Sequence, residues 1–305
     1  MRVVRVMERF LENPILKPIE VHAWESREVF NPAAIYLQGR VHLIYRAMGN
    51  DNISRLGYAV SSDGVHIDER LAEPILEPEN DNEQGGCEDP RISNIDDTLV
   101  LTYTALREHN HLQSYQVALT TISVKDFLLR NWNWGTRRLP FPGVFNKNAV
   151  VFPKKIGGRY VMFHRIEPTI CIAYSDDLKK WCDIMSIMGP RAESWDNLKI
   201  GIAGSPIRVS EGWLVVYHGV SDEKLYSLGI VLLDAEHPEQ VLYRSKTPIL
   251  APKEDYERFG KVPNVVFSCG NVVIDDRLFL YYGGADSVIC GASINFGDLL
   301  ASIRR

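Results

Sequence analysis

A set of cationic and hydrogen-bond-donating side chains is spread through the middle of the sequence, between residues 147 and 226. Arginine binds phosphate with a planar fork of donors and lysine binds it as a point charge, while amide, imidazole and hydroxyl groups supply neutral donors. Such a set, if the fold brings it together, predicts a site for a compact oxyanion such as phosphate. Its members are Lys147, Asn148, Arg165, Lys199, His218 and Tyr226.

The sharpest local string is Glu88-Asp89-Pro90-Arg91, which places a carboxylate directly before a proline. Asp-Pro is a common start of a turn or strand, so the pair alone is not specific. It gains meaning from its position at the head of a predicted hairpin. We expect Arg91 to hold the loop of Asp89 in place through an ion pair.

The elements that position these residues are five copies of one predicted β-hairpin. Each copy is a β-branched or aromatic run, a turn containing Gly or Asp, and a second such run. The copies span residues 31–46, 89–104, 148–165, 205–218 and 270–283.

The copies recur at a nearly constant period. The aromatic residue of the second strand lies at Tyr45, Tyr103, Phe163, Tyr217 and Tyr281, so the spacings are 58, 60, 54 and 64 residues. Additional strand-like segments between the copies make about four strands per repeat, which is the size of a propeller blade. We therefore predict an all-β fold, a single five-bladed β-propeller domain over residues 1–305, against the alternative of a two-sheet sandwich.

The two ends of the chain are predicted to meet. Residues 13–18, Asn-Pro-Ile-Leu-Lys-Pro, match the outer segments 73–78 and 247–252 but precede the first hairpin. The N-terminal strand should therefore complete the last four-stranded blade, next to residues 288–293.

In such a fold, the first residue of each hairpin and the last residue of its second strand reach one rim. Together these residues form a ring around the rim, and almost all of them are polar. A rim of Asn and Asp turns with only a structural role would be polar as well. The first residues are Asn31, Asp89, Asn148, Ser205 and Asn271, and the last are Arg46, Thr104, Arg165, His218 and Asp286.

Composition and charge exclude several classes of protein. With 34 Lys+Arg, 39 Asp+Glu and no long basic run, neither nucleic acid nor an anionic membrane is expected as a partner. No stretch is long and apolar enough for a membrane span or a signal peptide, so we expect a cytoplasmic protein. The five cysteines include no CxxC pair and should be reduced, mostly buried thiols. His109 and His111 lack a neighbouring carboxylate cluster, so no metal site is expected.

Taken together, these residues resemble glycoside hydrolase family 130, the β-mannoside phosphorylases and related β-mannosidases, over essentially the whole chain. The resemblance rests on Phe30-Asn31-Pro32, Tyr45-Arg46, Glu88 to Arg91, Asn148 with Phe152 to Ile156, His164-Arg165, Gly212-Trp213 to Tyr217-His218-Gly219, and Tyr281 to Asp286. It implies a five-bladed propeller. It also implies an inverting reaction with inorganic phosphate as co-substrate and no further cofactor.

The resemblance assigns roles to the candidate residues. Asp89 matches the general acid, which protonates the leaving oxygen through the mannosyl 3-hydroxyl. The phosphate-binding positions match Lys147, where many members have Arg, together with Asn148, Arg165, Lys199, His218 and Tyr226. The mannose-binding positions match Asn31, Arg46, Asp286 and, more weakly, Tyr103.

The expected reaction is reversible phosphorolysis of a β-mannoside, which releases α-mannose 1-phosphate. An inverting hydrolase needs a second carboxylate as base, whereas a phosphorylase needs only the acid because phosphate is itself the nucleophile. The hydrolytic alternative has Glu167, Asp222 or Glu223 as its conceivable base, and a non-catalytic sugar-binding propeller is the third reading.

The acceptor is set by outer loops, which we expect at residues 48–55 and 107–114. Their composition does not distinguish a β-1,4 from a β-1,2 acceptor. Of these, β-1,4-mannooligosaccharides or mannosyl-glucose are slightly preferred as the expected substrates. The sequence leaves open whether identical chains assemble.

Overall fold

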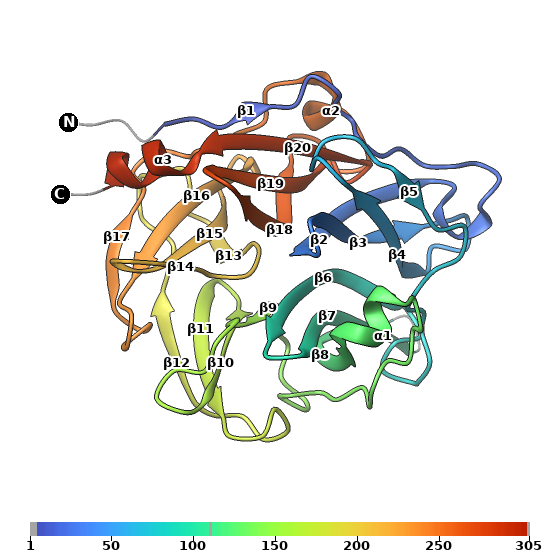
Figure 1. Ribbon diagram of the computed structural model, residues 1–305, viewed down its shortest axis with the longest axis horizontal. Coiled ribbons are helices and arrows are strands. Elements are labelled where there is room, and N and C mark those ends of the chain that lie inside the picture. Colours follow the sequence, from blue (N-terminus) through green and yellow to red (C-terminus); the bar gives the residue numbers. More distant parts are fainter. Residues whose placement is uncertain (1–4, 110–111, 304–305) are drawn as a thin grey trace.

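Strands dominate the fold, and they form antiparallel meanders arranged around a common centre (Figure 1). The computed structural model describes residues 5–109 and 112–303. The prediction of an all-β protein is confirmed. The short helical segments are η1 (Ala23–Glu25), α1 (Val124–Leu128), α2 (Asp255–Arg258) and α3 (Phe296–Ile303).

The first two meanders share one seven-stranded sheet. A single parallel contact, between Ser54 and Gly86, joins them. The first contains β2 (Glu28–Leu37), β3 (Arg40–Met48), β4 (Ser54–Ser61) and β5 (Glu69–Arg70). The second contains β6 (Gly86–Ile95), β7 (Thr98–His109) and β8 (Leu112–Ser123).

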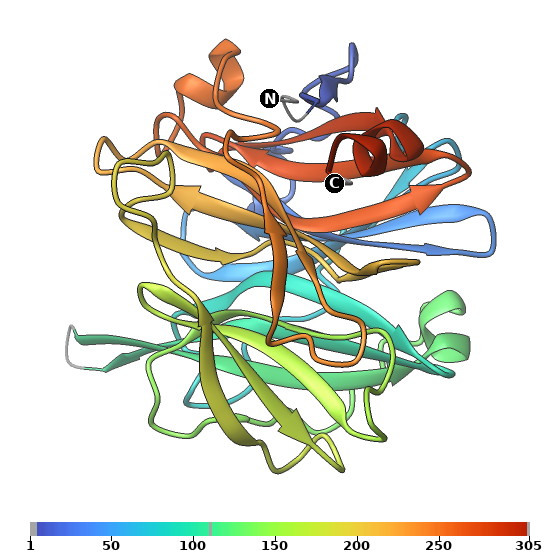
Figure 2. The same cartoon turned by 90° about the vertical axis from the view of Figure 1, so that its left-hand side faces the viewer.

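The remaining meanders form separate sheets. Figure 2 shows the second and third meanders, coloured teal to green, stacked beneath the fourth and fifth, coloured orange and red. The third contains β9 (Lys147–Val151), β10 (Tyr160–Ile166), β11 (Thr169–Ser175) and β12 (Cys182–Met188). The fourth contains β13 (Lys199–Ile202), β14 (Ile207–Val209), β15 (Gly212–Val220), β16 (Tyr226–Leu233) and β17 (Val241–Arg244). The fifth contains β18 (Val266–Ile274), β19 (Arg277–Gly284), β20 (Val288–Asn295) and β1 (Glu8–Arg9).

All five predicted hairpins are antiparallel pairs, but the fourth differs in detail. Its first strand is divided into β13 and β14, which both pair with β15. Pro206, in the gap between them, has no N–H to donate to a strand ladder. At Gly204 a Cβ atom would lie 2.2 Å from Oδ1 of Asn271, so only glycine fits beside the fifth meander.

The N-terminal strand pairs with the last hairpin, as the sequence predicts. In β1, Glu8 lies opposite Ser293 and Arg9 opposite Ala292 of β20. The three Pro-Ile-Leu segments have equivalent places, because Leu16, Leu76 and Leu250 each bridge to the third strand of a meander. All three leucines are buried. An N-terminal segment therefore supplies the outer edge of the C-terminal sheet.

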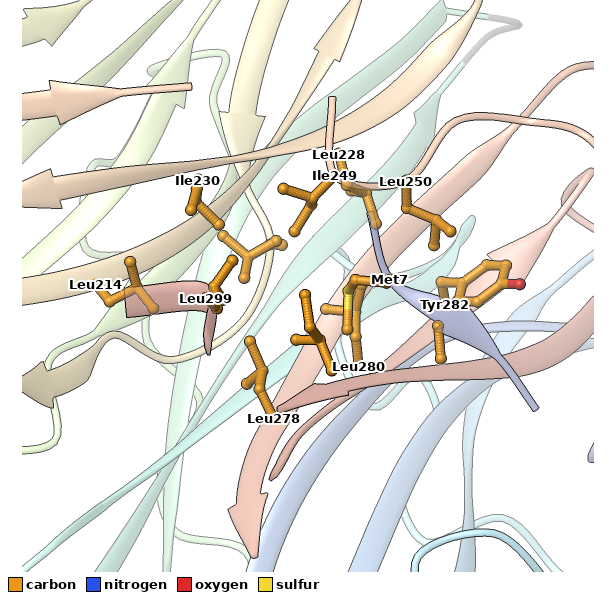
Figure 3. Packing of buried hydrophobic residues seen from close by; sticks show 14 of the residues in the cluster. Met7, Leu214, Leu228, Ile230, Ile249, Leu250, Leu278, Leu280, Tyr282 and Leu299 are labelled. Carbon is orange, nitrogen blue, oxygen red and sulfur yellow. The ribbon is translucent and has the colours of Figure 1, made fainter. Parts of the chain in front are cut away.

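The core lies between neighbouring meanders rather than at the centre. The largest cluster lies between the fourth and fifth meanders and includes Leu214, Leu228, Leu280, Leu299 and Met7 of the N-terminal segment (Figure 3). All five side chains are at most 3% exposed. Because the apolar side chains pack between the sheets, the inner strands are free to present polar groups to the central axis.

Two further predictions concern thiols and membranes. Cys87, Cys171, Cys269 and Cys290 are buried, Cys182 is exposed, and all five thiols are free, as expected. Within residues 5–109 and 112–303, no helix has the length and apolar character required to cross a membrane.

Candidate active site

Three inner strands contain the same local distortion. Asn31 of β2, Asp89 of β6 and Asn148 of β9 have φ angles of 50°, 49° and 55°. At each of them the register with the neighbouring strand shifts, which marks a β-bulge. Asn and Asp tolerate this left-handed conformation better than other non-glycine residues. A bulge re-aims a side chain and here directs three polar groups toward the centre.

These groups meet in a cavity of about 180 Å³ near the central axis. Of the eleven predicted site residues, nine line this cavity. Its lining comprises Asn31, Arg46, Glu88, Asp89, Lys147, Asn148, Arg165, Lys199, Tyr226, Val262, Val265, Phe267 and Asp286.

The first side of the cavity centres on Asp89. Asn31 Nδ2 donates to Asp89 Oδ1 at 2.8 Å, and Arg46 Nη1 donates to the same oxygen at 3.3 Å. Arg46 also forms an ion pair with Glu88. Because both hydrogen bonds from the described residues go to Oδ1, Oδ2 is the oxygen that a ligand can reach. The sequence analysis missed Glu88 as a lining residue, although it belongs to the string that singled out Asp89.

The surroundings of Asp89 act on its pKa in opposite directions. Burial raises the pKa, but the charge of Arg46, the hydrogen bond from Asn31 and the charges of Arg91 and Lys147 outweigh it. The net pKa is therefore below the ordinary value, and Asp89 is ionised at neutral pH without a ligand. A general acid at this position needs its proton from a change in surroundings on binding.

Asp286, in the turn after β19, behaves differently. It follows Ala285, and both residues have positive φ angles, 46° and 52°. Burial is the main cause that raises the pKa of Asp286 to about 6, and the negative charges of Asp89 and Glu88 also raise it, against the opposing charges of Arg46 and Lys261. The cavity therefore holds one carboxyl that stays partly protonated well above its usual range.

This raised pKa predicts a pH-dependent cost to folding. The folded protein binds a proton at Asp286 between pH 4 and 6 that the unfolded chain has lost, so stability falls as pH rises through this window. A shift from 3.8 to about 6 corresponds to about 3 kcal/mol. Asp286→Asn removes the titration. In urea unfolding, the variant should gain stability over wild type by about this amount between pH 4 and 7.5, and parallel pH curves for the two proteins would disprove the assignment.

The second side of the cavity is cationic. Lys147 and Arg165 are paired across β9 and β10, and Lys199 begins β13. Glu167 lies between two of these cations, with Oε2 3.3 Å from Arg165 Nη2 and Oε1 3.5 Å from Lys199 Nζ. Nε of Arg165 is buried without a hydrogen-bond partner among the described residues. Lys147 Nζ lies 4.6 Å from the centre of the Tyr115 ring.

Crowding of positive charge shows in the pKa values on this side. Burial, followed by the charge of Arg165, lowers the pKa of Lys147. Burial also lowers the pKa of Arg165. Buried cations that destabilise one another are partly relieved by an anion, so this side of the cavity is suited to bind one.

His218 lies directly behind the cavity wall rather than on its surface. Its ring is fully buried, and Nε2 is 3.3 Å from Asn148 Nδ2. Burial and the charges of Arg165 and Arg91 lower its pKa well below the ordinary value. His218 is therefore neutral at pH 7, and it contributes a hydrogen bond rather than the positive charge that its place among the cations suggested.

Arg91 is a buried residue that connects several strands through hydrogen bonds. The sequence predicted only that it holds the loop of Asp89. It is 1% exposed and donates to the carbonyl oxygens of Asp89 (3.0 Å), Ala203 (2.7 Å) and Ile202 (2.9 Å) and to Asn148 Oδ1 (3.4 Å). The expected ion pair with Asp89 is wrong, because the contact is to its backbone carbonyl. Arg91 thereby links the second, third and fourth meanders and adds a buried positive charge beneath both sides of the cavity.

Tyr103 lies away from the cavity. Its ring packs in the hydrophobic cluster of the first two meanders, and its hydroxyl donates to Glu83 at 2.5 Å. The cause is strand alternation, since Tyr103 lies opposite the Asp89 bulge with its side chain packed between the first two meanders. Thr104, expected at the rim, is buried in β7, opposite Glu88.

Two members of the expected polar ring, Ser205 and Asn271, line a different depression with Ser93 and Asn94. The reason is register. The residue at the bulge of the fifth meander is Cys269, which lies between Ser268 opposite Tyr282 and Gly270 opposite Tyr281. The sequence alignment of the hairpins therefore placed Asn271 where the structure has Cys269, two residues earlier. In the fourth meander, the interruption between β13 and β14 displaces Ser205 in the same way.

The conceivable bases of a hydrolase lie outside the cavity lining. Glu167 is engaged by Arg165 and Lys199, as described above. Asp222 and Glu223 are exposed in the turn after β15, where the backbone N–H of Asp222 donates to Asn197 Oδ1 at 3.0 Å. The predicted outer loop 107–114 includes residues 110–111 with His111, which lie outside the described residues.

Comparison with known proteins identifies the family of the chain. The family model for glycoside hydrolase family 130, described as beta-1,4-mannooligosaccharide phosphorylase, matches residues 6–305. A 1,2-beta-oligomannan phosphorylase of Thermoanaerobacter sp. (strain X514) is 43% identical over 300 residues, which cover 96% of this chain and 98% of that protein. A beta-1,2-mannobiose phosphorylase of the same organism is 43% identical over 296 residues, 93% of this chain and 95% of its own.

The fold is also found among solved structures. The beta-1,2-mannobiose phosphorylase from Listeria innocua, in complex with beta-1,2-mannobiose, superimposes with a TM-score of 0.84 at 27% identity. The match covers 97% of this chain and 99% of that chain. With the family model matched from residue 6 to residue 305, the chain belongs to glycoside hydrolase family 130.

Proposed function

We propose that the protein is an inverting glycoside phosphorylase that uses inorganic phosphate to cleave β-mannosides and releases α-mannose 1-phosphate. The observation that supports this most is the division of the cavity. Lys147, Arg165 and Lys199 come from β9, β10 and β13, whereas the carboxyl groups of Asp89 and Asp286 come from β6 and the turn after β19. A cationic half is suited to hold an anionic nucleophile, whereas an inverting hydrolase would need a free carboxylate base there.

In this proposal the cations do the work of a base by positioning phosphate. Arg165, Lys147 and Lys199 supply charge, while Asn148 and Tyr226 supply neutral hydrogen bonds. His218 contacts Asn148 from behind the cavity wall and holds it in place. A phosphate oxygen attacks the anomeric carbon of mannose as the bond to the leaving oxygen breaks, and the configuration inverts. Fixed donors held at the right distance lower the barrier without rearranging during the reaction.

Asp89 is proposed to supply the proton to the leaving oxygen, relayed by the mannosyl 3-hydroxyl. The positive charge of Lys147 is one cause of the low pKa of Asp89. Bound phosphate neutralises that charge, and bound sugar excludes water, so both raise the pKa of Asp89 toward the value that a general acid needs. Asn31, Arg46 and Asp286 are proposed to bind the mannosyl hydroxyls.

We infer a β-1,2 linkage for the substrate, in preference to the β-1,4-mannooligosaccharide or mannosyl-glucose slightly preferred from the sequence. Both relatives at 43% identity are named for β-1,2-linked mannosides. The family model has a β-1,4 description, but it covers the family as a whole.

For the scaffold, we infer that the meanders are the blades of one five-bladed propeller that forms a single catalytic domain. The near-constant repeat and the pairing of β1 with β20 support this closure. A cytoplasmic location stays a prediction.

The direct test is incubation with β-1,2-mannobiose in the presence and absence of inorganic phosphate. We expect mannose 1-phosphate and mannose to form in equal amounts, and only when phosphate is present. The products are separated by anion-exchange chromatography, and the anomer is assigned by NMR. Release of mannose alone in phosphate-free buffer, at a comparable rate, would contradict the proposal and indicate a hydrolase.

A further inference from the structure

The division of the cavity determines where the leaving saccharide must lie. In an inverting displacement the nucleophile and the leaving oxygen lie on opposite sides of the anomeric carbon. The proposed phosphate ligands come from β9, β10, β13 and β16, and β13 lies across the centre from β2 (Figure 1). The leaving saccharide is therefore directed toward the ends of β2 and β3 and toward the segment before β18.

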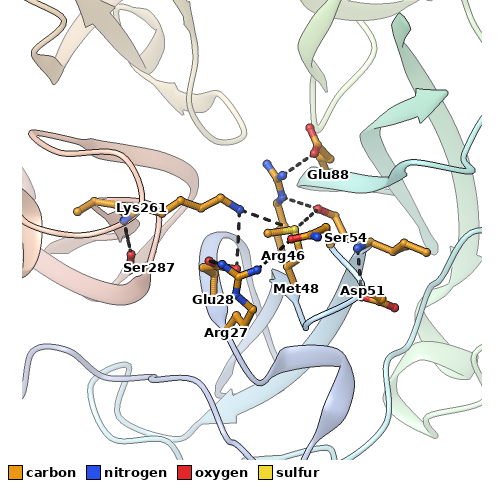
Figure 4. Close-up of polar contacts among 12 residues, drawn as sticks. Arg27, Glu28, Arg46, Met48, Asp51, Ser54, Glu88, Lys261 and Ser287 are labelled. Carbon is orange, nitrogen blue, oxygen red and sulfur yellow. Dashed lines mark hydrogen bonds and ion pairs between the residues drawn. The ribbon is translucent and has the colours of Figure 1, made fainter. Parts of the chain in front are cut away.

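A lysine with an unusual set of partners lies at that position. Lys261 Nζ is 3.8 Å from Glu28 Oε2 and 3.7 Å from Met48 Sδ (Figure 4). Its backbone N–H donates to Ser287 Oγ at 2.9 Å, which fixes the segment. Glu28 and Met48 lie opposite each other at the ends of β2 and β3.

Lys261 is held in place but remains able to donate. Its side chain is 38% exposed, while that of Glu28 is 7% exposed. Glu28 Oε2 is buried and has no hydrogen-bond partner among the described residues. Since an ammonium has three donors, and within the described chain its side-chain contacts are a thioether and an ion pair longer than a hydrogen bond, Lys261 has donors left for a ligand.

Lys261 is also connected, through a series of side-chain contacts, to Arg46 in the cavity lining. Arg46 Nε donates to Ser54 Oγ at 2.9 Å, and Ser54 Oγ lies 4.0 Å from Met48 Sδ. Figure 4 shows this series of contacts running from Arg46 and Glu88 to Lys261. The next residue, Val262, lines the cavity itself. Lys261 therefore lies one step outward from the proposed mannose-binding residues, at the cavity mouth.

We propose that Lys261 binds the leaving saccharide, donating to hydroxyl groups of the sugar next to the scissile bond, and that Glu28 positions its ammonium. The inference rests on the proposed phosphorylase function and deepens it. A hydroxyl oxygen accepts from the ammonium, while Val262, which lines the cavity, offers apolar contact to the C–H groups of the same ring. Phosphate and mannose 1-phosphate do not reach Lys261.

The test uses the synthetic direction, in which mannose 1-phosphate and a saccharide acceptor are varied independently. Lys261→Met keeps the apolar stem and removes the charge. It should raise the KM for the acceptor, mannose, about 10- to 100-fold, as expected when hydrogen bonds from a charged group are lost. The KM for mannose 1-phosphate should stay within about twofold of wild type on the same reasoning.

Three further variants refine the test. Lys261→Arg retains a cation and should restore most of the acceptor affinity. Glu28→Gln removes the ion pair and should raise the acceptor KM less than Lys261→Met does. Lys253→Met is the matched control, because Lys253 precedes α2 and its side chain is 77% exposed.

The outcomes separate this inference from the proposed function. If the wild-type protein does not interconvert mannose 1-phosphate and a β-mannoside, the proposed function fails. If wild type is active and Lys261→Met leaves the acceptor KM unchanged, or raises the KM for mannose 1-phosphate instead, only the inference on Lys261 fails.

Discussion

Replacing Asp89 with asparagine is expected to lower kcat for phosphorolysis about 1,000-fold, the middle of the range for loss of a general acid. The fold should survive, because an amide oxygen at Oδ1 still accepts from Asn31 Nδ2 and Arg46 Nη1. The variant loses the transferable proton and the negative charge that pairs with Arg46. The measurement is the initial rate of mannose 1-phosphate release at saturating β-1,2-mannobiose and phosphate, with thermal unfolding of both proteins to confirm folding.

A substrate with a better leaving group makes this test specific for proton donation. Dinitrophenolate needs no proton to depart, so Asp89→Asn should lose far less rate on dinitrophenyl β-mannoside than on mannobiose. Asp97→Asn, at the exposed turn of the same hairpin, is the control and should behave as wild type. Equal losses on both substrates would show that Asp89 has a structural role rather than an acidic one.

The second large effect is expected at Arg165. Arg165→Ala removes a buried guanidinium whose Nε lacks a partner within the described chain, and should raise the KM for phosphate about 100-fold. A saturating concentration of phosphate should restore part of the rate, because Lys147 and Lys199 remain to bind it. The KM for phosphate is measured at saturating mannobiose, and Arg165→Lys should recover only part of the affinity because lysine lacks the planar fork.

The control for this variant lies at the other end of the same strand. Arg159 precedes β10 and pairs with Asp183 at 2.8 Å on the surface, so Arg159→Ala should leave the phosphate KM unchanged. A phosphate KM for Arg165→Ala that matches wild type would remove this residue from the proposed anion site. A loss of mannobiose affinity at unchanged phosphate KM would place it on the sugar side instead.

The local features of the fold were predictable because they depend on short-range patterning. Runs of β-branched and aromatic residues around Gly or Asp turns predicted each hairpin. The repeated Pro-Ile-Leu segments predicted the pairing of the N-terminal segment with the last sheet. The sequence also placed Asn31, Asp89 and Asn148 at the heads of their hairpins. The bulges found there suit these residue types, since asparagine and aspartate adopt positive φ at low cost.

Strand register and side-chain burial could not be predicted from the sequence, because they depend on which strands become neighbours. Asn271 was expected at the cavity, yet Cys269 occupies the bulge two residues earlier and Asn271 lines another depression. Tyr103 has the residue type of a sugar-binding group, but the pleat of β7 turns its ring into the core. A bulge or a change of strand register decides which residue reaches the centre, and composition does not report it.

The sequence by itself determined the all-β architecture, the repeated hairpins and the residue types available for phosphate and sugar. Only the tertiary structure decided how those groups act on one another. It made His218 neutral, lowered the pKa of Asp89 while raising that of Asp286 to about 6, and placed Arg91 beneath both sides of the cavity. The reason is that burial and charge at a few ångströms set these properties, and they arise only when separate strands meet at the centre.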